Sequence, residues 1–286
     1  MKASLVFVLL AIGCQHLSAQ QVYPLYGDKI PPSTLGTLDE KNRPFITAYL
    51  PVKSAQKNMA IIIFPGGGYR TLVTQTEGEP IAEAFAKKGI AAFVLHYRLP
   101  DDRLMVNKHI VPLMDAQQAL LWVKTHHDEL GVDTARVGVI GYSAGGHLAA
   151  MTGTHFSSVW VPNPGQVSLR PAFMALVYPV ISMEPNLAHM GSRQALLGLS
   201  PSPEQIHFFS AEQHVGKDTP PTYIIHSVSD SVVSVNNSLV LFDALSNHGV
   251  NAELHLVSHG NHGFVHSFKV DDWVNPILSW LSRKGF

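Results

Sequence analysis

The sequence predicts an α/β fold in which a mostly parallel, doubly wound sheet has helices on both faces. Two observations carry this prediction. Apolar runs of strand length alternate along the chain with helix-forming segments. The run at 59–64 contains no charged residue, as expected for a strand buried on both faces of a parallel sheet. Right-handed crossovers then distribute the helices over both faces, and 286 residues with a 46% hydrophobic share suffice for one large core.

The expected elements follow one another in a regular order. We expect strands at 45–50, 59–64, 90–95, 137–140, 173–177, 222–226 and Ala252–Val257. We expect helices at 79–88, 115–127, 144–153, Asn236–Asn247 and 273–281. Residues 20–44 should lie on the surface, and 156–171 and 181–220 interrupt the alternation. Both segments should pass over the C-terminal ends of the strands, where parallel sheets bind their ligands.

The N-terminus has the pattern of a secretory signal peptide, predicted to occupy residues 1–19. Lys2 precedes an apolar stretch, 5–13, that is too short to span a bilayer, and Ala19 offers a small residue before a cleavage site. A buried N-terminal strand fits the order of Lys and apolar residues less well. The residues around Cys14, the only cysteine, match a lipoprotein signal only in part, so ordinary cleavage is the preferred prediction. We therefore expect a secreted or periplasmic single domain over 20–286, with no disulfide and no membrane span.

Composition and histidine spacing argue against two classes of partner. The net charge is −1 and no basic run is present, so nucleic acid is not an expected partner. The spacing of four histidines would place them on one helix face, as in a metal site; they are His255, His259, His262 and His266. Two glycines interrupt that segment, however, and no H-E-x-x-H motif occurs. We expect no metal and no cofactor, and nothing in the sequence indicates an oligomeric state.

The segment around Ser143 predicts a catalytic nucleophile. The sequence Gly141-Tyr142-Ser143-Ala144-Gly145 joins the strand at 137–140 to a helix, which is the required context of a G-x-S-x-G nucleophile elbow. So sharp a turn strains the backbone of the central serine, and side chains on the flanking glycines would collide. The alternative, an ordinary serine in a glycine-rich turn, does not account for the strand and helix on either side.

A serine nucleophile needs a base and a carboxylate that orients it. Chains with this elbow supply these groups in the order Ser, Asp or Glu, His. Asp230 follows the strand at 222–226, and His262 follows the last strand. Asp218, which precedes its strand, is the rival for the acid, and His259 and, more weakly, His266 are the rivals for the base. The alternative role for Asp230 is a turn or helix cap. We predict a triad of Ser143, Asp230 and His262.

The oxyanion hole is expected to combine two backbone segments. The N–H of Ala144 follows the nucleophile, and Gly67 and Gly68 follow the strand at 59–64, where the second donor belongs. No Lys-Ser or Lys-Thr follows the glycines, so they do not form a P-loop. Tyr69 and Tyr142 adjoin these segments and are expected to contact the substrate, bounding a short acyl pocket and stacking on a sugar ring.

Together these segments resemble the α/β-hydrolase esterases, and in particular the bacterial secreted acetyl-xylan-esterase-like and feruloyl/acetyl esterase branch. The likeness extends from about residue 45 to the C-terminus. Besides the elbow, it is carried by Gly66-Gly67-Gly68-Tyr69, Glu77-Gly78-Glu79-Pro80, Gly191-Ser192-Arg193 and His262-Gly263-Phe264. The resemblance implies an α/β-hydrolase fold and a cofactor-free serine esterase that removes acetyl or feruloyl groups from a plant polysaccharide such as xylan. Two positions depart from the pattern: Pro65 replaces a frequent His, and Ser234 replaces a frequent Pro.

Several other functions remain open at this point. A general short-chain carboxylesterase or lipase would use the same triad, but 181–220 is mixed and His-rich where a long-acyl lipase has a broad apolar lid. A peptidase would need an extra domain for which the chain lacks length. A metal-dependent deacetylase and an inactive, glycan-binding hydrolase fold are the alternatives from other classes. The complete set of Ser143, Asp230 and His262 argues against a pure binding protein.

Overall fold

The computed structural model describes residues 20–51 and 58–286, so the predicted signal peptide at 1–19 lies outside the described residues. One eight-stranded sheet runs through the described chain in the order β1-β2-β4-β3-β5-β6-β7-β8. The strands are β1 (Gln21–Pro24), β2 (Phe45–Tyr49), β3 (Asn58–Phe64), β4 (Ala91–His96), β5 (Val132–Tyr142), β6 (Met174–Val177), β7 (Thr222–Ser227) and β8 (Ala252–Val257).

Strand pairing confirms the predicted mostly parallel sheet. β1 pairs with β2 and β2 with β4 in antiparallel fashion, and the remaining neighbours, from β4 through β3 to β8, are all parallel. The edge strand β1 was not predicted. Most of its four residues are exposed, so it lacks the apolar signature of a buried strand.

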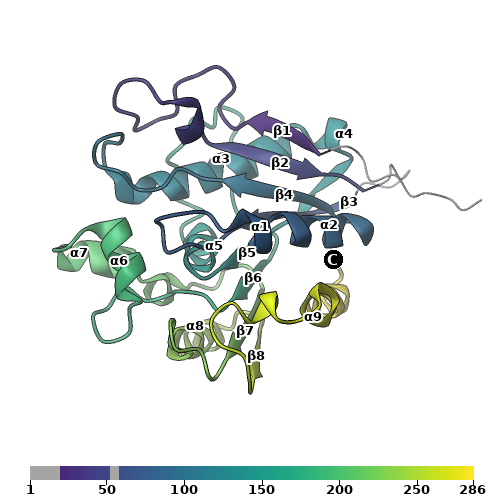
Figure 1. Cartoon of the computed structure of the whole chain (residues 1–286). Coiled ribbons are helices and arrows are strands. Elements are labelled where there is room, and N and C mark those ends of the chain that lie inside the picture. Colours follow the sequence, from purple (N-terminus) through teal and green to yellow (C-terminus); the bar gives the residue numbers. More distant parts are fainter. Residues whose placement is uncertain (1–19, 52–57) are drawn as a thin grey trace, which may run out of the picture.

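Helices cover both faces of this sheet, as predicted. They are α1 (Thr74–Glu77), α2 (Glu79–Lys87), α3 (Val111–Thr125), α4 (His127–Leu130), α5 (Ala144–Thr154), α6 (Met190–Leu197), α7 (Pro203–Phe208), α8 (Asn236–Asn247) and α9 (Val270–Arg283). Short 3-10 turns occur at η1 (Glu40–Asn42), η2 (Lys108–Ile110), η3 (Ala211–His214) and η4 (Phe264–His266). One apolar core joins the sheet to α3, α5 and α8, and a second joins the opposite face to α2 and α9 (Figure 1).

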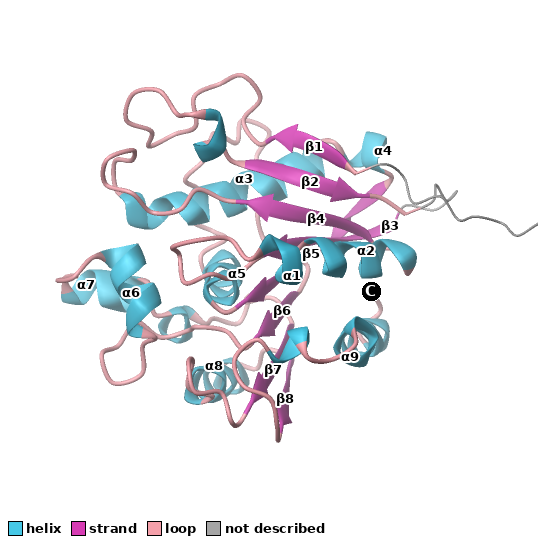
Figure 2. Cartoon of the chain, in the orientation of Figure 1, coloured by secondary structure: helices cyan, strands magenta, loops and turns pink. Residues whose placement is uncertain are grey.

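The largest differences from the predicted elements concern where helices begin and what 181–220 contains. The helix expected at 115–127 begins earlier, at Val111, because Pro112 fits the first turn of a helix. The helix expected at 273–281 extends over Val270–Arg283. Residues 181–220 hold α6, α7 and η3, and α6 and α7 lie beyond the end of the sheet toward which β4 runs (Figure 2). This is the end at which ligands bind in parallel sheets.

Candidate active site

The turn between β5 and α5 holds Ser143 in a strained conformation. Its φ and ψ angles are 51° and −117°, which few non-glycine residues adopt. Three backbone hydrogen bonds hold it there. The N–H of Ser143 donates to the carbonyl of Val177 at 3.0 Å, and its carbonyl accepts from His147 at 3.1 Å and Val180 at 3.0 Å. The surrounding structure therefore supports the strain at this position.

Close backbone packing accounts for the two glycines of the elbow. A Cβ atom at Gly141 would lie 2.1 Å from the carbonyl oxygen of Gly145, and one at Gly145 would lie 2.1 Å from that of Phe64. Neither neighbour is the end of a flexible side chain that could move aside. The predicted reason for both glycines is confirmed.

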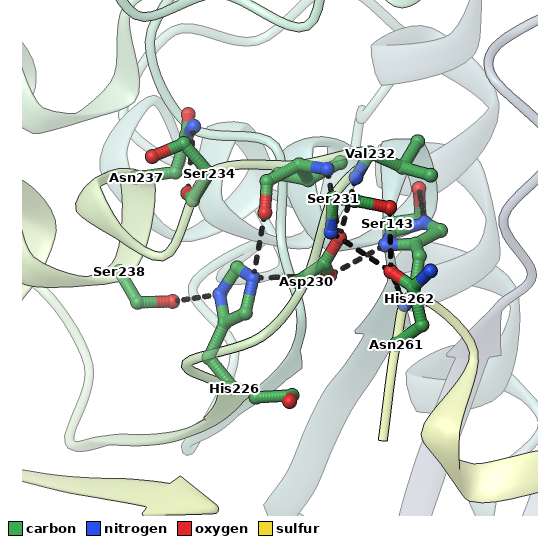
Figure 3. A network of polar contacts seen from close by, with 12 residues as sticks. Ser143, His226, Asp230, Ser231, Val232, Ser234, Asn237, Ser238, Asn261 and His262 are labelled. Carbon is green, nitrogen blue, oxygen red and sulfur yellow. Dashed lines mark hydrogen bonds and ion pairs between the residues drawn. The ribbon is translucent and has the colours of Figure 1, made fainter. Parts of the chain in front are cut away.

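Ser143, His262 and Asp230 lie in one hydrogen-bonded chain (Figure 3). The Oγ atom of Ser143 is 2.8 Å from Nε2 of His262, and Nδ1 of His262 is 2.7 Å from Oδ2 of Asp230. The three residues come from the β5–α5 elbow, the loop after β7 and the loop after β8. The structure thus brings together the three residues that the sequence singled out. Since Nδ1–H donates to the carboxylate, Nε2 is free to accept the serine proton.

The side chain of Asp230 has no solvent-accessible surface, and both of its carboxylate oxygens have hydrogen-bond partners. Its Oδ1 accepts from the N–H groups of Val232 and Val233, both at 2.9 Å, and its Oδ2 contacts His262 and, at 3.2 Å, Nε2 of His226. Burial raises the pKa of Asp230, but the hydrogen bonds from His226, His262 and Val233 outweigh burial and hold the pKa well below its usual range. Asp230 therefore stays ionised wherever the triad would operate.

His226 is a second imidazole on this carboxylate, and sequence reasoning missed it. It is fully buried at the C-terminal end of β7. Its Nε2–H donates to the carbonyl of Val233 at 3.0 Å and faces Asp230, while its Nδ1 accepts from the hydroxyl of Ser238 at 2.7 Å (Figure 3). A histidine in a buried apolar strand, four residues before a candidate Asp, is the signal that could have identified it.

The acid and base loops are joined directly. Both the N–H and the hydroxyl of Ser231 donate to Oδ1 of Asn261, at 2.8 and 2.9 Å, and the N–H of His262 donates to the same atom at 2.8 Å (Figure 3). Asn261 therefore ties the residue after Asp230 to the residue that carries the base.

Two of the rival residues, His259 and Asp218, lie at the surface. His259 is exposed, and its Nδ1 is 3.2 Å from the hydroxyl of Ser258. Asp218 is 66% exposed and pairs with Lys217 at 2.8 Å. His266 lies near the site, 3.5 Å from the carboxylate of Glu77, but the hydrogen bond to Ser143 comes from His262.

Alanine at position 262 is expected to abolish turnover, while alanine at position 259 changes it little. His262 is the imidazole within bonding distance of the Ser143 hydroxyl, and losing a triad member costs on the order of 10⁶ in kcat. Steady-state hydrolysis of 4-nitrophenyl acetate by His262→Ala and His259→Ala measures the difference. A larger loss in His259→Ala would show that the base is misassigned.

The glycine loop after β3 lies against the nucleophile. A Cβ atom at Gly66 would be 3.1 Å from Cβ of Ser143. The N–H of Gly66 donates to Glu77, whereas no protein acceptor in the described ranges takes the N–H of Gly67, Gly68 or Ala144. Gly67 and Gly68 have φ angles of 122° and 65°, which glycine adopts without strain. The loop that carries the predicted donors Gly67 and Gly68 therefore begins against Ser143, and no protein acceptor in the described ranges occupies the N–H groups of the predicted donors.

A buried carboxylate, Glu77, supports both this loop and the base. It is 4% exposed; its Oε2 accepts the N–H of Gly66 and its Oε1 accepts the hydroxyl of Tyr178, both at 2.8 Å. The ring of Tyr178 in turn packs 4.7 Å from that of His262. Sequence reasoning noted Glu77 only within the Glu-Gly-Glu-Pro element; its partners lie 11 and 101 residues away. Glu77 is a positioning residue for the donors and the base alike.

The loop does not need a histidine at position 65. The hydroxyl of Tyr97 donates to the carbonyl of Pro65 at 2.8 Å, next to the bond between Gly66 and Glu77. These two bonds supply the support that the departure from the family pattern put in doubt.

Removal of the Glu77 carboxylate is expected to lower kcat with little change in KM. We expect Glu77→Ala to lose about 10² in kcat, comparable to the loss of one oxyanion donor, because the loop loses its anchor. Glu77→Gln should lose less, since its amide oxygen can still accept one of the two hydrogen bonds. Glu83→Ala, an exposed carboxylate on α2, is the matched control. A rise in KM at unchanged kcat would contradict the positioning role.

The two tyrosines predicted to contact substrate are buried instead. Tyr142 has no accessible surface, and its ring lies 5.8 Å from Trp273 on the α9 side of the sheet. The expectation for Tyr142 is wrong, because alternation along β5 directs the residue before the nucleophile into that core. Tyr69 is 2% exposed, and its hydroxyl is 2.8 Å from Nδ1 of His147.

His147 connects the glycine loop to the segment over the site. Its Nε2–H donates to the carbonyl of Phe209 at 2.7 Å, so its Nδ1 accepts from the Tyr69 hydroxyl. Burial lowers the pKa of His147 to about 4, so the ring is neutral at neutral pH. Tyr69 therefore holds the oxyanion loop on α5 and offers a substrate almost no side-chain surface.

The described ranges contain neither a cluster of metal-ligand side chains nor a membrane-spanning helix. No group of three or more His, Cys, Asp or Glu side chains in these ranges is placed to hold a metal ion. No helix in them is both long and apolar enough to cross a membrane.

Curated relatives of this chain include enzymes of xylan breakdown. It is 33% identical over 222 residues to endo-1,4-beta-xylanase B of Butyrivibrio fibrisolvens, an alignment that covers 77% of this chain and 34% of that protein. It is 32% identical over 251 residues to the acetylxylan esterase of Xylanibacter ruminicola, covering 85% of this chain and 49% of that protein. The chain thus spans about a third of the length of the xylanase and about half of the length of the acetylxylan esterase.

Solved structures and a family model agree with this likeness. The acetyl ester-xyloside bifunctional hydrolase from Caldicellulosiruptor lactoaceticus superposes with a TM-score of 0.83 at 38% identity, covering 93% of this chain and 97% of that one. The BD-FAE family model matches residues 46–245, which include the elbow and the acid loop. The chain belongs to the BD-FAE family, whose domain is of the α/β-hydrolase type.

Proposed function

We propose that this protein is a serine esterase that removes acetyl groups from xylan. The observation that carries the proposal is the chain of 2.8 and 2.7 Å hydrogen bonds from Ser143 through His262 to Asp230. The similarity to an acetylxylan esterase and to an acetyl ester-xyloside hydrolase supports xylan as the substrate class. A set of this geometry activates a serine hydroxyl for acyl transfer.

The first half-reaction forms an acetyl-enzyme. Nε2 of His262 takes the proton from Oγ of Ser143 as that oxygen bonds to the acetyl carbonyl carbon. The negative charge that develops on the carbonyl oxygen is stabilised by the N–H groups of Gly67, Gly68 and Ala144. His262 then gives its proton to the sugar oxygen, the ester bond breaks, and the deacetylated sugar leaves.

Water completes the cycle by the same route. It loses a proton to Nε2 of His262 as its oxygen attacks the acetyl carbon, and the proton then returns to Oγ of Ser143 when acetate departs. In both halves the ionised Asp230 stabilises the imidazolium and keeps the proton on Nδ1.

The position of α6 supports a short acyl pocket. The hydroxyl of Ser192 lies 3.8 Å from where a Cβ of Gly68 would be, and the ring of His189 caps this helix through Ser192. The start of α6 therefore forms a wall next to the oxyanion loop. Tyr69 and Tyr142, being buried, do not contribute to this wall.

We therefore expect the specificity constant to fall from 4-nitrophenyl acetate to the butyrate, with octanoate a poor substrate. In an open apolar channel each added methylene would favour the longer ester by about 0.8 kcal/mol, or about fourfold. Initial rates on the three esters test this. A rise along the series would favour the lipase alternative.

The proposed function is tested by acetate release from acetylated xylan, acetylated pectin and acetylated mannan in parallel. We expect xylan to give the highest kcat/KM, and feruloylated arabinoxylan in a fourth arm decides whether feruloyl groups are also removed. Equal rates on all polysaccharides would favour a general carboxylesterase. Inhibition by EDTA that zinc reverses would favour a metal-dependent deacetylase.

We also propose export through the segment at 1–19. The Lys2-then-apolar order supports this proposal, as does the polymeric substrate, which a cell cannot take up intact. N-terminal sequencing of the protein recovered from the periplasm or medium should begin near Gln20. A chain that begins at a lipid-modified Cys14 would show membrane anchoring instead.

A further inference from the structure

A cavity of about 670 Å³ lies next to the oxyanion loop, and the described mechanism does not use it. We call it the arginine pocket; its lining includes Arg43, Phe45, Arg70, His96, Leu104 and Lys108. Its volume is in the range of sites that enclose small molecules, and a sugar unit with a substituent would fit.

Most charges around the arginine pocket are neutralised within the protein. Arg98 forms a buried pair with Asp115 at 2.7 Å, and Lys108 pairs with Asp102 at 2.5 Å. The carboxylate of Asp101, which also lines the pocket, pairs with a neighbouring arginine at 2.7 Å. None of these groups leaves a net charge for a ligand.

Arg43 and Arg70 are the exception. Both residues line the pocket and are exposed, and no carboxylate within the described part of the chain lies at ion-pair distance from either. Two unneutralised cations on one cavity favour an anionic ligand, and a guanidinium binds a carboxylate through two parallel hydrogen bonds.

One wall of the same pocket is flat and uncharged. The rings of Phe45 and His96 stack with centroids 3.9 Å apart and 17° between their planes. Burial lowers the pKa of His96 to about 4, so this ring carries no charge at neutral pH. Such a wall suits the apolar face of a pyranose ring.

The pocket begins close to the nucleophile. The N–H of Arg70 donates to the carbonyl of Gly67 at 3.0 Å, so Arg70 lies one turn beyond the predicted oxyanion donors. Arg70 also lies near His189, the N-cap residue of α6: burial is the main cause that lowers the pKa of His189, and the charges of His262 and Arg70 contribute to it. A group bound at Arg70 would therefore lie beside the loop that carries the predicted oxyanion donors.

We propose that the arginine pocket binds the carboxylate of a uronic acid branch on acetylated xylan, so that the enzyme prefers acetyl groups near acidic branches. The choice of xylan as the polymer rests on the proposed function. The preference for a negatively charged ligand does not, because the two unpaired arginines favour an acidic sugar over a neutral one. A neutral xylan backbone would leave both cations without a partner.

Binding tests the pocket independently of catalysis. Calorimetric titration of the Ser143→Ala protein compares xylotetraose with the same oligosaccharide carrying one 4-O-methylglucuronic acid branch. We expect the acidic oligosaccharide to bind about tenfold more tightly, as for a charge-assisted hydrogen-bond pair. Adding Arg43→Gln and Arg70→Gln should remove that preference, whereas Arg283→Gln, an exposed arginine at the end of α9, should keep it. Equal affinities for the two oligosaccharides would overturn the proposal.

Kinetics supply the second readout and separate the two proposals. With acidic acetylated xylan, Arg43→Gln/Arg70→Gln should raise KM about tenfold at unchanged kcat; on the same xylan trimmed by an α-glucuronidase, KM should change less than twofold. Equal rises in KM on both xylans would overturn the pocket assignment. Tight binding of the acidic oligosaccharide without acetate release from either xylan would refute the proposed function and support the pocket.

Discussion

Replacement of Ser143 by alanine is expected to lower kcat for acetate release by about 10⁶ while the protein remains folded. The Ser143 hydroxyl is the group that forms a hydrogen bond with Nε2 of His262, so its removal leaves the base with no serine oxygen to activate. The fold should survive because the strained backbone is held by bonds to Val177, His147 and Val180 that do not involve the side chain.

Acetate release, measured together with thermal unfolding, tests this expectation. Ser282→Ala, on the exposed side of α9, is the matched control and should keep the wild-type rate. A Ser143→Ala protein that unfolds normally and retains most of its activity would refute the assignment of the nucleophile.

Asparagine at position 230 is expected to lower kcat by about 10⁴. The amide oxygen can still accept from Val232 and Val233, which preserves the turn. The amide nitrogen would then face Nδ1 of His262 and favour the tautomer with its proton on Nε2, which cannot accept a proton from Ser143. The matched control is Asp218→Asn, whose carboxylate is exposed. A larger loss in Asp218→Asn would show that the acid is misassigned.

The same substitution should change how stability depends on pH. Because the folded protein holds the pKa of Asp230 below its ordinary value, this carboxylate stabilises the fold above that ordinary value. The contribution disappears as the pH falls through the lowered pKa. Asp230→Asn lacks it at every pH, so its free energy of unfolding should be lower than wild type at pH 7 and should fall less in acid. Denaturant unfolding at pH 7 and pH 3 measures this; identical pH dependence in both proteins would contradict it.

Local patterns account for what the sequence predicted well. Central parallel strands such as β3 are buried on both faces, so their apolar runs stand out. The elbow is recognisable because its glycines are required by contacts within a few residues or with the neighbouring strand. Ser143, Asp230 and His262 could be grouped from the sequence because each follows a parallel strand, β5, β7 or β8, and these strands end at the same edge of the sheet.

Long-range contacts account for what the sequence did not predict. Glu77 reaches Tyr178 across 101 residues, and His226 is visible as a partner of Asp230 only once β7 and its loop are folded. Tyr142 was assigned to the site from its position beside the nucleophile, although strand alternation directs its ring to the opposite core. α7 is short, with no buried side chain, so its apolar periodicity is absent.

The central claim, that Ser143 performs the deacetylation of xylan, is tested most directly by labelling with phenylmethylsulfonyl fluoride. The labelled fraction of the peptide that contains Ser143 is compared with the residual rate of acetate release from acetylated xylan. We predict that the rate falls in proportion to sulfonylation of Ser143, that acetylated xylan slows both, and that EDTA affects neither. Full labelling of Ser143 with acetate release unchanged, or loss of activity without a label on Ser143, would contradict the claim.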